Sequence, residues 1–302
     1  MTTEQRIKNL KTPTHPVDVV LDTDTFNEID DQFAVAYMFA NEDKLNVKAL
    51  YAAPFYNKLS DGPEDGMEKS YNEILKLFQL MGKSAPTFRG SDRYVPNENT
   101  FVESSAARDL VERAKGYSPE APLYVVAIGA ITNIASALIM CPQIAENIVV
   151  VWLGGHAHHF DNTREFNMVQ DIAAARVVMN SGVPFVQLPC MGVVSEFRIS
   201  GAELNDWLIG KNEIADYLAK NTIVAAEEYA SGLPWTRVIW DVTAVAWLLN
   251  DNDRFMKTRI VKTRLPEYSG LYSEEEQEHE MAYVYFIRRD ELMTDLIEKI
   301  TK

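Results

Sequence analysis

One stretch decides the fold: Val19-Val20-Leu21-Asp22-Thr23-Asp24-Thr25-Phe26-Asn27-Glu28-Ile29-Asp30-Asp31, an apolar run followed at once by an aspartate-rich loop. The apolar run is typical of a buried β-strand, and the segment from Asp31 to Asn41 has the pattern of a helix. Four aspartates therefore lie between a strand and a helix. In open α/β sheets, ligands bind at this edge, beyond the carboxyl ends of the strands.

The four aspartates occupy positions 22, 24, 30 and 31. Carboxylates this close together disfavour one another's ionised form unless a cation compensates them. Oxygen ligands grouped in this way suit Ca²⁺ or Mg²⁺. The plainer alternative is that Asp30 only caps the helix and Asp22 only begins a turn, but a cap needs a single acid. The pattern therefore favours a divalent-cation site.

Strands and helices alternate along the chain beyond this stretch. Further apolar strands are predicted at residues 47–52, 123–128, 147–153 and 185–188, with helical segments between them. This alternation predicts an α/β fold, with a mostly parallel, doubly wound (Rossmann-like) sheet flanked by helices.

The C-terminal part of the sequence has a different pattern. The pattern of residues 202–250 is almost wholly helical, which predicts additional C-terminal helices. Segments 259–263 and 281–286 are strand-like, and we expect the acidic run between them, residues 274–280, to be a solvated loop or hairpin turn. No repeat or linker divides the chain, so we expect one domain over residues 1–302.

The formal net charge of −15 argues against two classes of partner. Nucleic acid requires a basic face for phosphate contacts, and anionic membranes attract basic segments. No apolar run reaches the roughly 18 residues of a membrane span, and residues 1–17 lack the apolar core of a signal peptide. The two cysteines, Cys141 and Cys190, form no paired motif. We expect a cytoplasmic protein.

Polar residues follow several predicted strands, and the ends of parallel strands meet at one edge. They are Asn57, then Thr132 and Asn133, then His156, His158, His159, Asn162, Glu165 and Asn167, and finally Asp241 at the start of an apolar helix. Each alone has a plainer interpretation: Thr132, Asn133 and Asp241 as helix caps, the histidines as surface residues, Glu165 as one of an exposed pair with Arg164, and Trp240 as core. Their shared position at strand ends favours a site.

Taken in order, these motifs resemble the inosine-uridine-preferring nucleoside hydrolase family. The resemblance covers about residues 18 to 250 and is carried by the double-aspartate loop, by Thr132-Asn133, by Glu165-Phe166-Asn167 after Gly154-Gly155, and by Asp241. It implies a mostly parallel sheet surrounded by helices, one bound Ca²⁺, and hydrolysis of the N-glycosidic bond of ribonucleosides. It also implies a homo-oligomer, either dimer or tetramer, whose substrate is a small molecule.

The resemblance further implies individual roles. Calcium would be held by Asp24, Asp31, Asp241 and the backbone carbonyl of Thr132. Asp30 would bind a ribose hydroxyl, and Asp24 would also accept a proton from the attacking water. The substrate would contact Asn57, Asn162, Glu165, Asn167, Trp240 and Asp241. These residue types suit the reaction, because positive charge develops on the sugar and carboxylate and amide oxygens stabilise it.

The sequence departs from the family pattern at three places. Five residues, Thr25–Ile29, separate the two aspartate pairs where the family usually has three, and the segment from Asn162 to Glu165 is shorter than usual. Many members carry a histidine before the late aspartate to protonate the leaving base, whereas this chain has Trp240. Some purine-preferring members also have tryptophan there, which favours purine nucleosides. The acid could instead come from His156, His158 or His159.

Two other functional hypotheses stay open at the level of sequence. The enlarged first loop and the missing histidine allow a non-catalytic relative that binds a nucleoside or ribose. The motif Asp22-Thr23-Asp24 after an apolar strand also resembles the haloacid dehalogenase phosphatases, whose first aspartate is a nucleophile. Those enzymes usually have Thr or Val where this chain has Phe26, and the phosphatase hypothesis leaves Glu165-Phe166-Asn167 unexplained.

Overall fold

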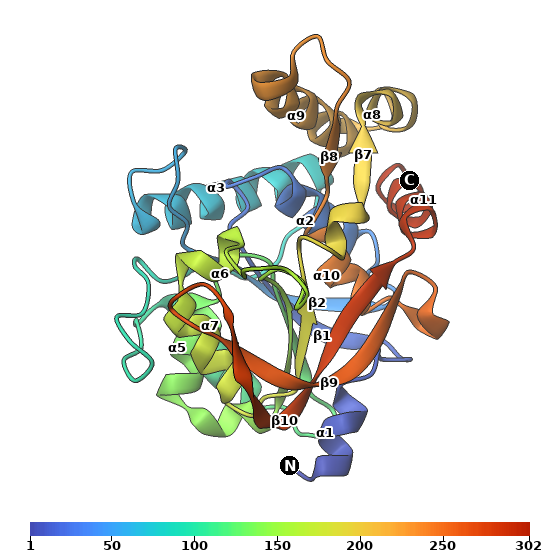
Figure 1. The fold of residues 1–302 in the computed structure, drawn as a ribbon. Helices are drawn as coiled ribbons and strands as arrows, with labels where there is room; N and C mark the ends of the chain where they lie inside the picture. The colour runs from blue at the N-terminus through green and yellow to red at the C-terminus, as the bar shows by residue number, and fades with distance from the viewer.

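The computed structural model describes residues 1–302 and is built around one eight-stranded sheet (Figure 1). In spatial order the strands are β3 (Thr87–Arg89), β2 (Leu45–Ala52), β1 (Val17–Thr23), β4 (Leu123–Ala127), β5 (Ile148–Leu153), β6 (Phe185–Leu188), β10 (Tyr272–Ile287) and β9 (Met256–Pro266). Every neighbouring pair is parallel except β9 with β10. The predicted α/β fold class is confirmed.

The strand order reverses between β1 and β4. From β1 the chain proceeds outward through β2 and β3, and it then returns to β4 on the other side of β1. In doubly wound sheets this reversal leaves a crevice beyond the carboxyl ends of the strands, where ligands bind. The connection from β1 to α2 lies at this switch point, with Asp24 in the loop and Asp30 and Asp31 at the start of the helix.

Helices cover both faces of the sheet. One hydrophobic cluster includes α2 (Asp30–Phe39), α3 (Pro63–Met81), α10 (Val242–Trp247) and α11 (Arg289–Ile300), and the other includes α4 (Ser105–Ala114), α5 (Thr132–Met140) and α7 (Ile172–Asn180). Successive residues of β1 alternate between the clusters: Val20 belongs to one and Leu21 to the other, and both are fully buried. Burial on both faces explains why the strands read as continuous apolar runs.

A smaller unit projects from one end of the molecule (Figure 1). It contains α8 (Gly201–Trp207), α9 (Glu213–Ala230) and a two-stranded antiparallel sheet of β7 (Arg198–Ser200) and β8 (Thr236–Val238). The prediction of additional helices is therefore confirmed, although β8 interrupts the region expected to be almost wholly helical. β8 brings the chain back to Asp241 at the start of α10. No helix combines the length and the apolar character that crossing a lipid bilayer requires.

The acidic run at residues 274–280 is not a loop or a turn, so that prediction was wrong. These residues lie within β10 and pair with β9 in the antiparallel direction. Basic side chains on β9 compensate them: Arg264 Nη2 lies 3.3 Å from Glu276 Oε1, and Lys262 Nζ lies 3.9 Å from Glu280 Oε1. Opposite charges across paired strands stabilise a sheet, and this contribution does not appear in the pattern of a single strand.

Candidate active site

Asp30 and Asp31 open α2 but do not cap it. The residue that precedes the helix is Ile29, and no side chain accepts a capping hydrogen bond there. Asp241 stands before α10 and likewise caps no backbone N–H group. The interpretation of these aspartates as simple helix caps is therefore wrong, because their carboxylates point elsewhere.

The carboxylates of Asp30, Asp31 and Asp241 form a buried cluster. One oxygen from each lies within 4.8 Å of the others, although the third residue is some 210 positions further along the chain. Burial raises the pKa of Asp31 to about 7, and burial together with the neighbouring carboxylates raises the pKa of Asp30 and of Asp241 well above the ordinary value. A divalent cation would remove the cost of charging this cluster.

Asp24 lies beside this cluster and is buried. Both of its carboxylate oxygens are buried without a hydrogen-bond partner, as are Asp30 Oδ1 and Asp241 Oδ1. Burial and the charge of Asp31 raise the pKa of Asp24 well above its usual range. A Cβ atom on Gly129 would lie 2.7 Å from Asp24 Oδ1, so only glycine leaves room for this carboxylate. Buried oxygens without donors are the ligands that a hard cation requires, so these residues fit Ca²⁺.

Asn133 and Thr132 contribute their side chains to the framework of this loop cluster. Asn133 Nδ2 donates to Asp22 Oδ1 at 2.8 Å, and its Oδ1 accepts from the backbone N–H of Ser91 at 2.8 Å. The hydroxyl of Thr132 donates to Asp171 Oδ2 at 2.7 Å. Asp22 is thus held by an amide and does not line the cleft, and the Thr132 hydroxyl is engaged by Asp171.

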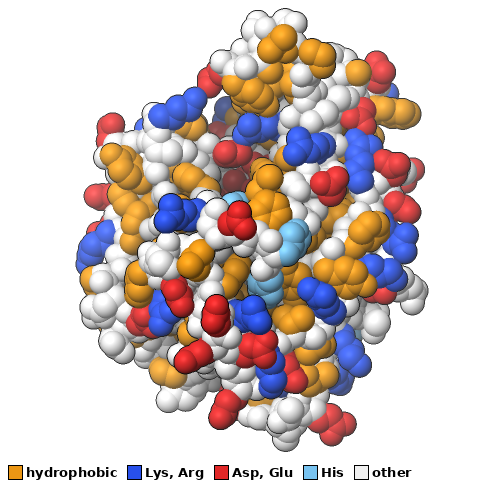
Figure 2. Space-filling model, viewed as in Figure 1, with side chains coloured by type: hydrophobic (Ala, Val, Ile, Leu, Met, Phe, Trp, Pro, Cys, Tyr) orange, Lys and Arg blue, Asp and Glu red, His pale blue; other side chains and the backbone are white.

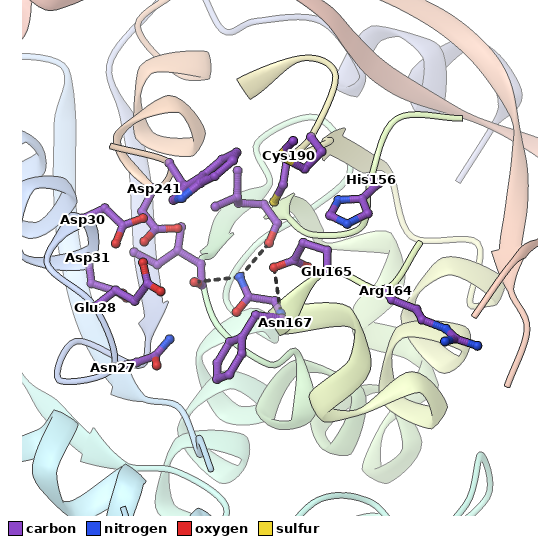
Figure 3. Close-up of a pocket in the computed structure, with 15 residues that line it drawn as sticks. Asn27, Glu28, Asp30, Asp31, His156, Arg164, Glu165, Asn167, Cys190 and Asp241 are labelled. Atoms are coloured by element: carbon purple, nitrogen blue, oxygen red, sulfur yellow. Dashed lines mark hydrogen bonds between the residues drawn. The ribbon is translucent and has the colours of Figure 1, made fainter. Parts of the chain in front are cut away.

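A cleft of about 250 Å³ lies beside the cluster (Figures 2 and 3). Seven residues singled out in the sequence line it: Asp30, Asp31, His156, Glu165, Asn167, Trp240 and Asp241. They come from the loop after β1, the loop after β5 and the segment before α10. The strand-end rule therefore places distant parts of the chain around one cavity.

Glu165 and Asn167 have their hydrogen bonds fixed by the backbone. Glu165 precedes α6 (Phe166–Gln170), and its carboxylate accepts from three backbone N–H groups at 2.8–3.0 Å. Asn167 Nδ2 donates to the carbonyls of Ile128 and Leu153 at 3.1 and 3.0 Å (Figure 3). With its NH₂ group engaged, Asn167 keeps Oδ1 as an acceptor. An acceptor in the cleft suits a sugar hydroxyl.

Two of the predicted substrate contacts do not line the cleft. Asn162 Oδ1 accepts from the backbone N–H of Arg164 at 3.0 Å, which closes a local turn. Asn57 Nδ2 donates to Asn27 Oδ1 at 2.6 Å, and it is Asn27 that lines the cleft. Asn57 therefore supports the enlarged first loop from behind.

The three histidines of the loop after β5 occupy different environments. His156 lines the cleft, and its Nδ1 is buried without a partner. His158 packs between the rings of Tyr272 and Tyr283, and burial lowers its pKa to about 4. His159 is exposed. Only the first therefore reaches the cavity.

Several lining residues were not found from the sequence. Asn27 and Glu28 lie in the enlarged loop, and Glu28 Oε2 accepts from Arg237 Nη2 of β8 at 2.6 Å. Cys190 and Met191 follow β6. The end of β6 is a strand end like the others, so the same rule would have located the last two.

Comparison with known proteins agrees with the fold. The family model for inosine-uridine preferring nucleoside hydrolases matches residues 19–284. A non-specific ribonucleoside hydrolase, RihC, from Salmonella paratyphi B is 29% identical over 254 residues, which cover 76% of this chain and 78% of that protein.

Two solved structures share the fold. A purine-preferring ribonucleoside hydrolase from Gardnerella vaginalis superposes with a TM-score of 0.73 and 19% identity, covering 94% of this chain and 98% of that one. An inosine-guanosine nucleoside hydrolase gives a TM-score of 0.74 with 15% identity, again over 94% and 98% of the two chains. The family match spans β1 to β10, and the predicted resemblance is confirmed. The chain therefore belongs to the inosine-uridine preferring nucleoside hydrolase family and is an N-glycosidase that hydrolyses ribonucleosides.

Proposed function

We propose that this protein is a calcium-dependent hydrolase of purine ribonucleosides, which releases the free base and ribose. The observation that carries the proposal is the convergence of Asp30, Asp31 and Asp241 at the base of a cleft, with unpartnered oxygens on Asp24 beside them. These acids come from distant parts of the chain, Asp24, Asp30 and Asp31 from the β1–α2 connection and Asp241 from the segment before α10. We also propose that residues 1–302 act as one domain, because neither half contains the whole cluster.

Asp24, Asp31, Asp241 and the backbone carbonyl of Thr132 would hold the calcium ion. When bound, the ion supplies charge neutralisation, coordination of the ribose diol and activation of a water molecule. Calcium suits this donor set because it accepts many oxygen ligands in irregular geometry, and every side chain in the cluster is a carboxylate.

The residues of the cleft supply the remaining chemistry. Asp24 accepts the proton of the water that attacks C1′ of the sugar, since both its oxygens are free of donors. Asp30 and Asn167 Oδ1 accept hydrogen bonds from ribose hydroxyls and orient the sugar. Positive charge develops on the sugar as the glycosidic bond lengthens, and the surrounding carboxylates stabilise it.

Trp240 supports the preference for purines. It precedes Asp241, lines the cleft and is half-buried. Stacking of a base on an aromatic ring contributes roughly 1–3 kcal/mol, and the larger purine gains more contact. The relative from Gardnerella vaginalis is described as purine-preferring, which agrees with this proposal.

A panel of ribonucleosides tests the proposal. Inosine, guanosine, adenosine, uridine and cytidine are incubated with the protein, with calcium or after treatment with a chelator, and free ribose and free base are quantified. We expect base and ribose in equal amounts, the highest kcat/KM for a purine nucleoside, and loss of activity without calcium. Tight nucleoside binding without release of base would support the non-catalytic alternative instead, and faster hydrolysis of pyrimidines would overturn the purine preference.

A further inference from the structure

Departure of a purine from ribose requires a proton, and none of the residues assigned so far provides one. The electron pair of the glycosidic bond moves onto the base nitrogen, so a neutral purine leaves easily only if that charge is quenched. Trp240 occupies the position next to Asp241, and an indole N–H is a hydrogen-bond donor that does not release its proton near neutral pH. The acidic cluster lies on the sugar side, where Asp24 must accept a proton.

The group that protonates the leaving base must therefore lie elsewhere in the cleft. His156 comes from the loop after β5 and stands across the cavity from Asp30 and Asp31, with Glu165 and Asn167 between them (Figure 3). If the ribose diol occupies the acidic side, the larger base must extend along the remaining lining, which includes Trp240 and His156. Figure 2 shows histidine side chains near the middle of this face, among hydrophobic ones.

We propose that His156 is the general acid that protonates the leaving base. The inference rests on the proposed function and deepens it. As the C1′–N bond breaks, the base nitrogen takes the bond's electron pair and the imidazolium proton of His156. Water adds its oxygen to C1′ and gives a proton to Asp24, so one proton enters the enzyme and one leaves in each turnover.

The hydrogen-bonding state of His156 agrees with this role. Its Nδ1 is buried but has no hydrogen-bond partner in the protein, so this nitrogen is left for a hydrogen bond with a ligand. One face of the ring packs against Phe160, with ring centroids 5.8 Å apart. Burial lowers the pKa of His156, so its imidazolium form is a stronger acid than that of an exposed histidine.

The turn that presents His156 is held firmly. The hydroxyl of Tyr272 donates to the carbonyl of His156 at 3.1 Å and accepts from Gln187 Nε2 at 2.7 Å. The preceding residue, Gly155, has φ +74°, and a Cβ atom there would lie 2.3 Å from the Tyr272 hydroxyl. This close approach requires glycine. The backbone that carries the imidazole is thus held by the first residue of β10.

The other ionisable groups near this side of the cleft are poorer acids. Burial and the charge of Glu165 raise the pKa of the Cys190 thiol well above its usual value, so it holds its proton. Arg164 Nη2 donates to the carbonyl of Ser269 at 3.0 Å, and a guanidinium does not give up a proton in water. His158 and His159 do not line the cavity.

A comparison of leaving groups tests the proposal. The variants are His156→Gln and, as a matched control on the same loop, His159→Gln. The substrates are inosine, whose base needs protonation, and p-nitrophenyl β-D-ribofuranoside, whose leaving group departs as a stable anion. We expect His156→Gln to lose at least about 100-fold in kcat on inosine and to stay within a few-fold of wild type on the nitrophenyl riboside. His159→Gln should match wild type on both.

The outcomes separate the possible failures. Activity of His156→Gln on the nitrophenyl riboside shows that the variant folds and holds its metal. Equal losses on both substrates, or full activity on inosine, would overturn the role of His156 and leave the proposed function intact. Failure of the wild-type protein on both substrates would instead overturn the proposed function itself.

Discussion

Replacing Asp31 by asparagine is expected to stabilise the metal-free protein at neutral pH while abolishing its response to calcium. Asp31 is 1% exposed and belongs to the buried cluster with Asp30 and Asp241. Burial, reinforced by the charge of Glu28, raises its pKa from 3.8 to about 7. The ionised side chain therefore opposes folding unless a cation is present.

The magnitude follows from linkage between protonation and folding. A carboxyl whose pKa is higher in the folded state contributes its full stability below the unfolded pKa, and this stability is lost as the pH rises through the folded pKa. A rise from 3.8 to about 7 corresponds to about 4 kcal/mol, lost between about pH 4 and pH 7. Asparagine has no charge to bury, and it can still accept a hydrogen bond from Thr23, as Asp31 does. We expect the free energy of unfolding of the metal-free variant to be higher than that of wild type by up to about 4 kcal/mol at pH 7.5.

Urea unfolding followed by circular dichroism measures the effect, with EDTA or CaCl₂ present, at pH 5 and pH 7.5. In EDTA at pH 7.5, we expect the free energy of unfolding of Asp31→Asn to be higher than that of wild type. This difference should be smaller at pH 5. The control is Asp171→Asn, because Asp171 is also buried but accepts bonds from Thr132 and two backbone N–H groups outside the cluster. This control should lose stability and keep the calcium response. A destabilised Asp31→Asn in EDTA, or one that calcium still stabilises like wild type, would refute the reasoning.

Three further predictions concern the catalytic base Asp24, the aromatic ring of Trp240 and the buried His158. Asp24→Asn should fold and bind nucleoside but lose at least about 100-fold in kcat, as measured by ribose release; normal turnover would refute its role as the base. Trp240→Ala should lower kcat/KM for inosine by about 10- to 100-fold, with Trp240→Phe intermediate and uridine less affected; equal losses on both nucleosides would contradict stacking of a purine. Burial lowers the pKa of His158 from 6.5 to about 4, so the unfolded chain binds that proton at a higher pH than the folded chain does. The free energy of unfolding of wild type should therefore fall by about 3 kcal/mol between pH 6.5 and pH 4. His158→Phe keeps an aromatic ring between Tyr272 and Tyr283 and should lack this loss in urea titrations; an unchanged pH dependence would show that other groups cause it.

The sequence was sufficient to locate the centre of the site because parallel strands end at the same edge. Asp30 and Asp31 follow β1, and Glu165 and Asn167 follow β5, so the topology alone brings them together once the sheet is predicted. Asp241 stood out only as the start of an apolar helix, and the family resemblance is what placed it with the other metal ligands. The fold class followed from the same alternation of apolar strands and helices.

Other features depend on directions and pairings that a linear pattern does not contain. Glu28 and Arg237 are far apart in the chain and meet only when β8 returns beside the first loop. His156 and His158 are two positions apart, yet only the first faces the cleft, because Tyr272 and Tyr283 enclose the second. The acidic run of β10 read as a loop because its basic partners lie on a different strand.

Calorimetric titration of the chelator-treated protein with calcium, with ribose release from inosine followed in the same samples, tests the central claim most directly. The claim is that Asp24, Asp31 and Asp241 hold one divalent ion that hydrolysis requires. The account predicts one calcium ion per chain and activity that rises in proportion to occupancy. Full turnover in the calcium-free protein, or an absence of calcium binding, would contradict it.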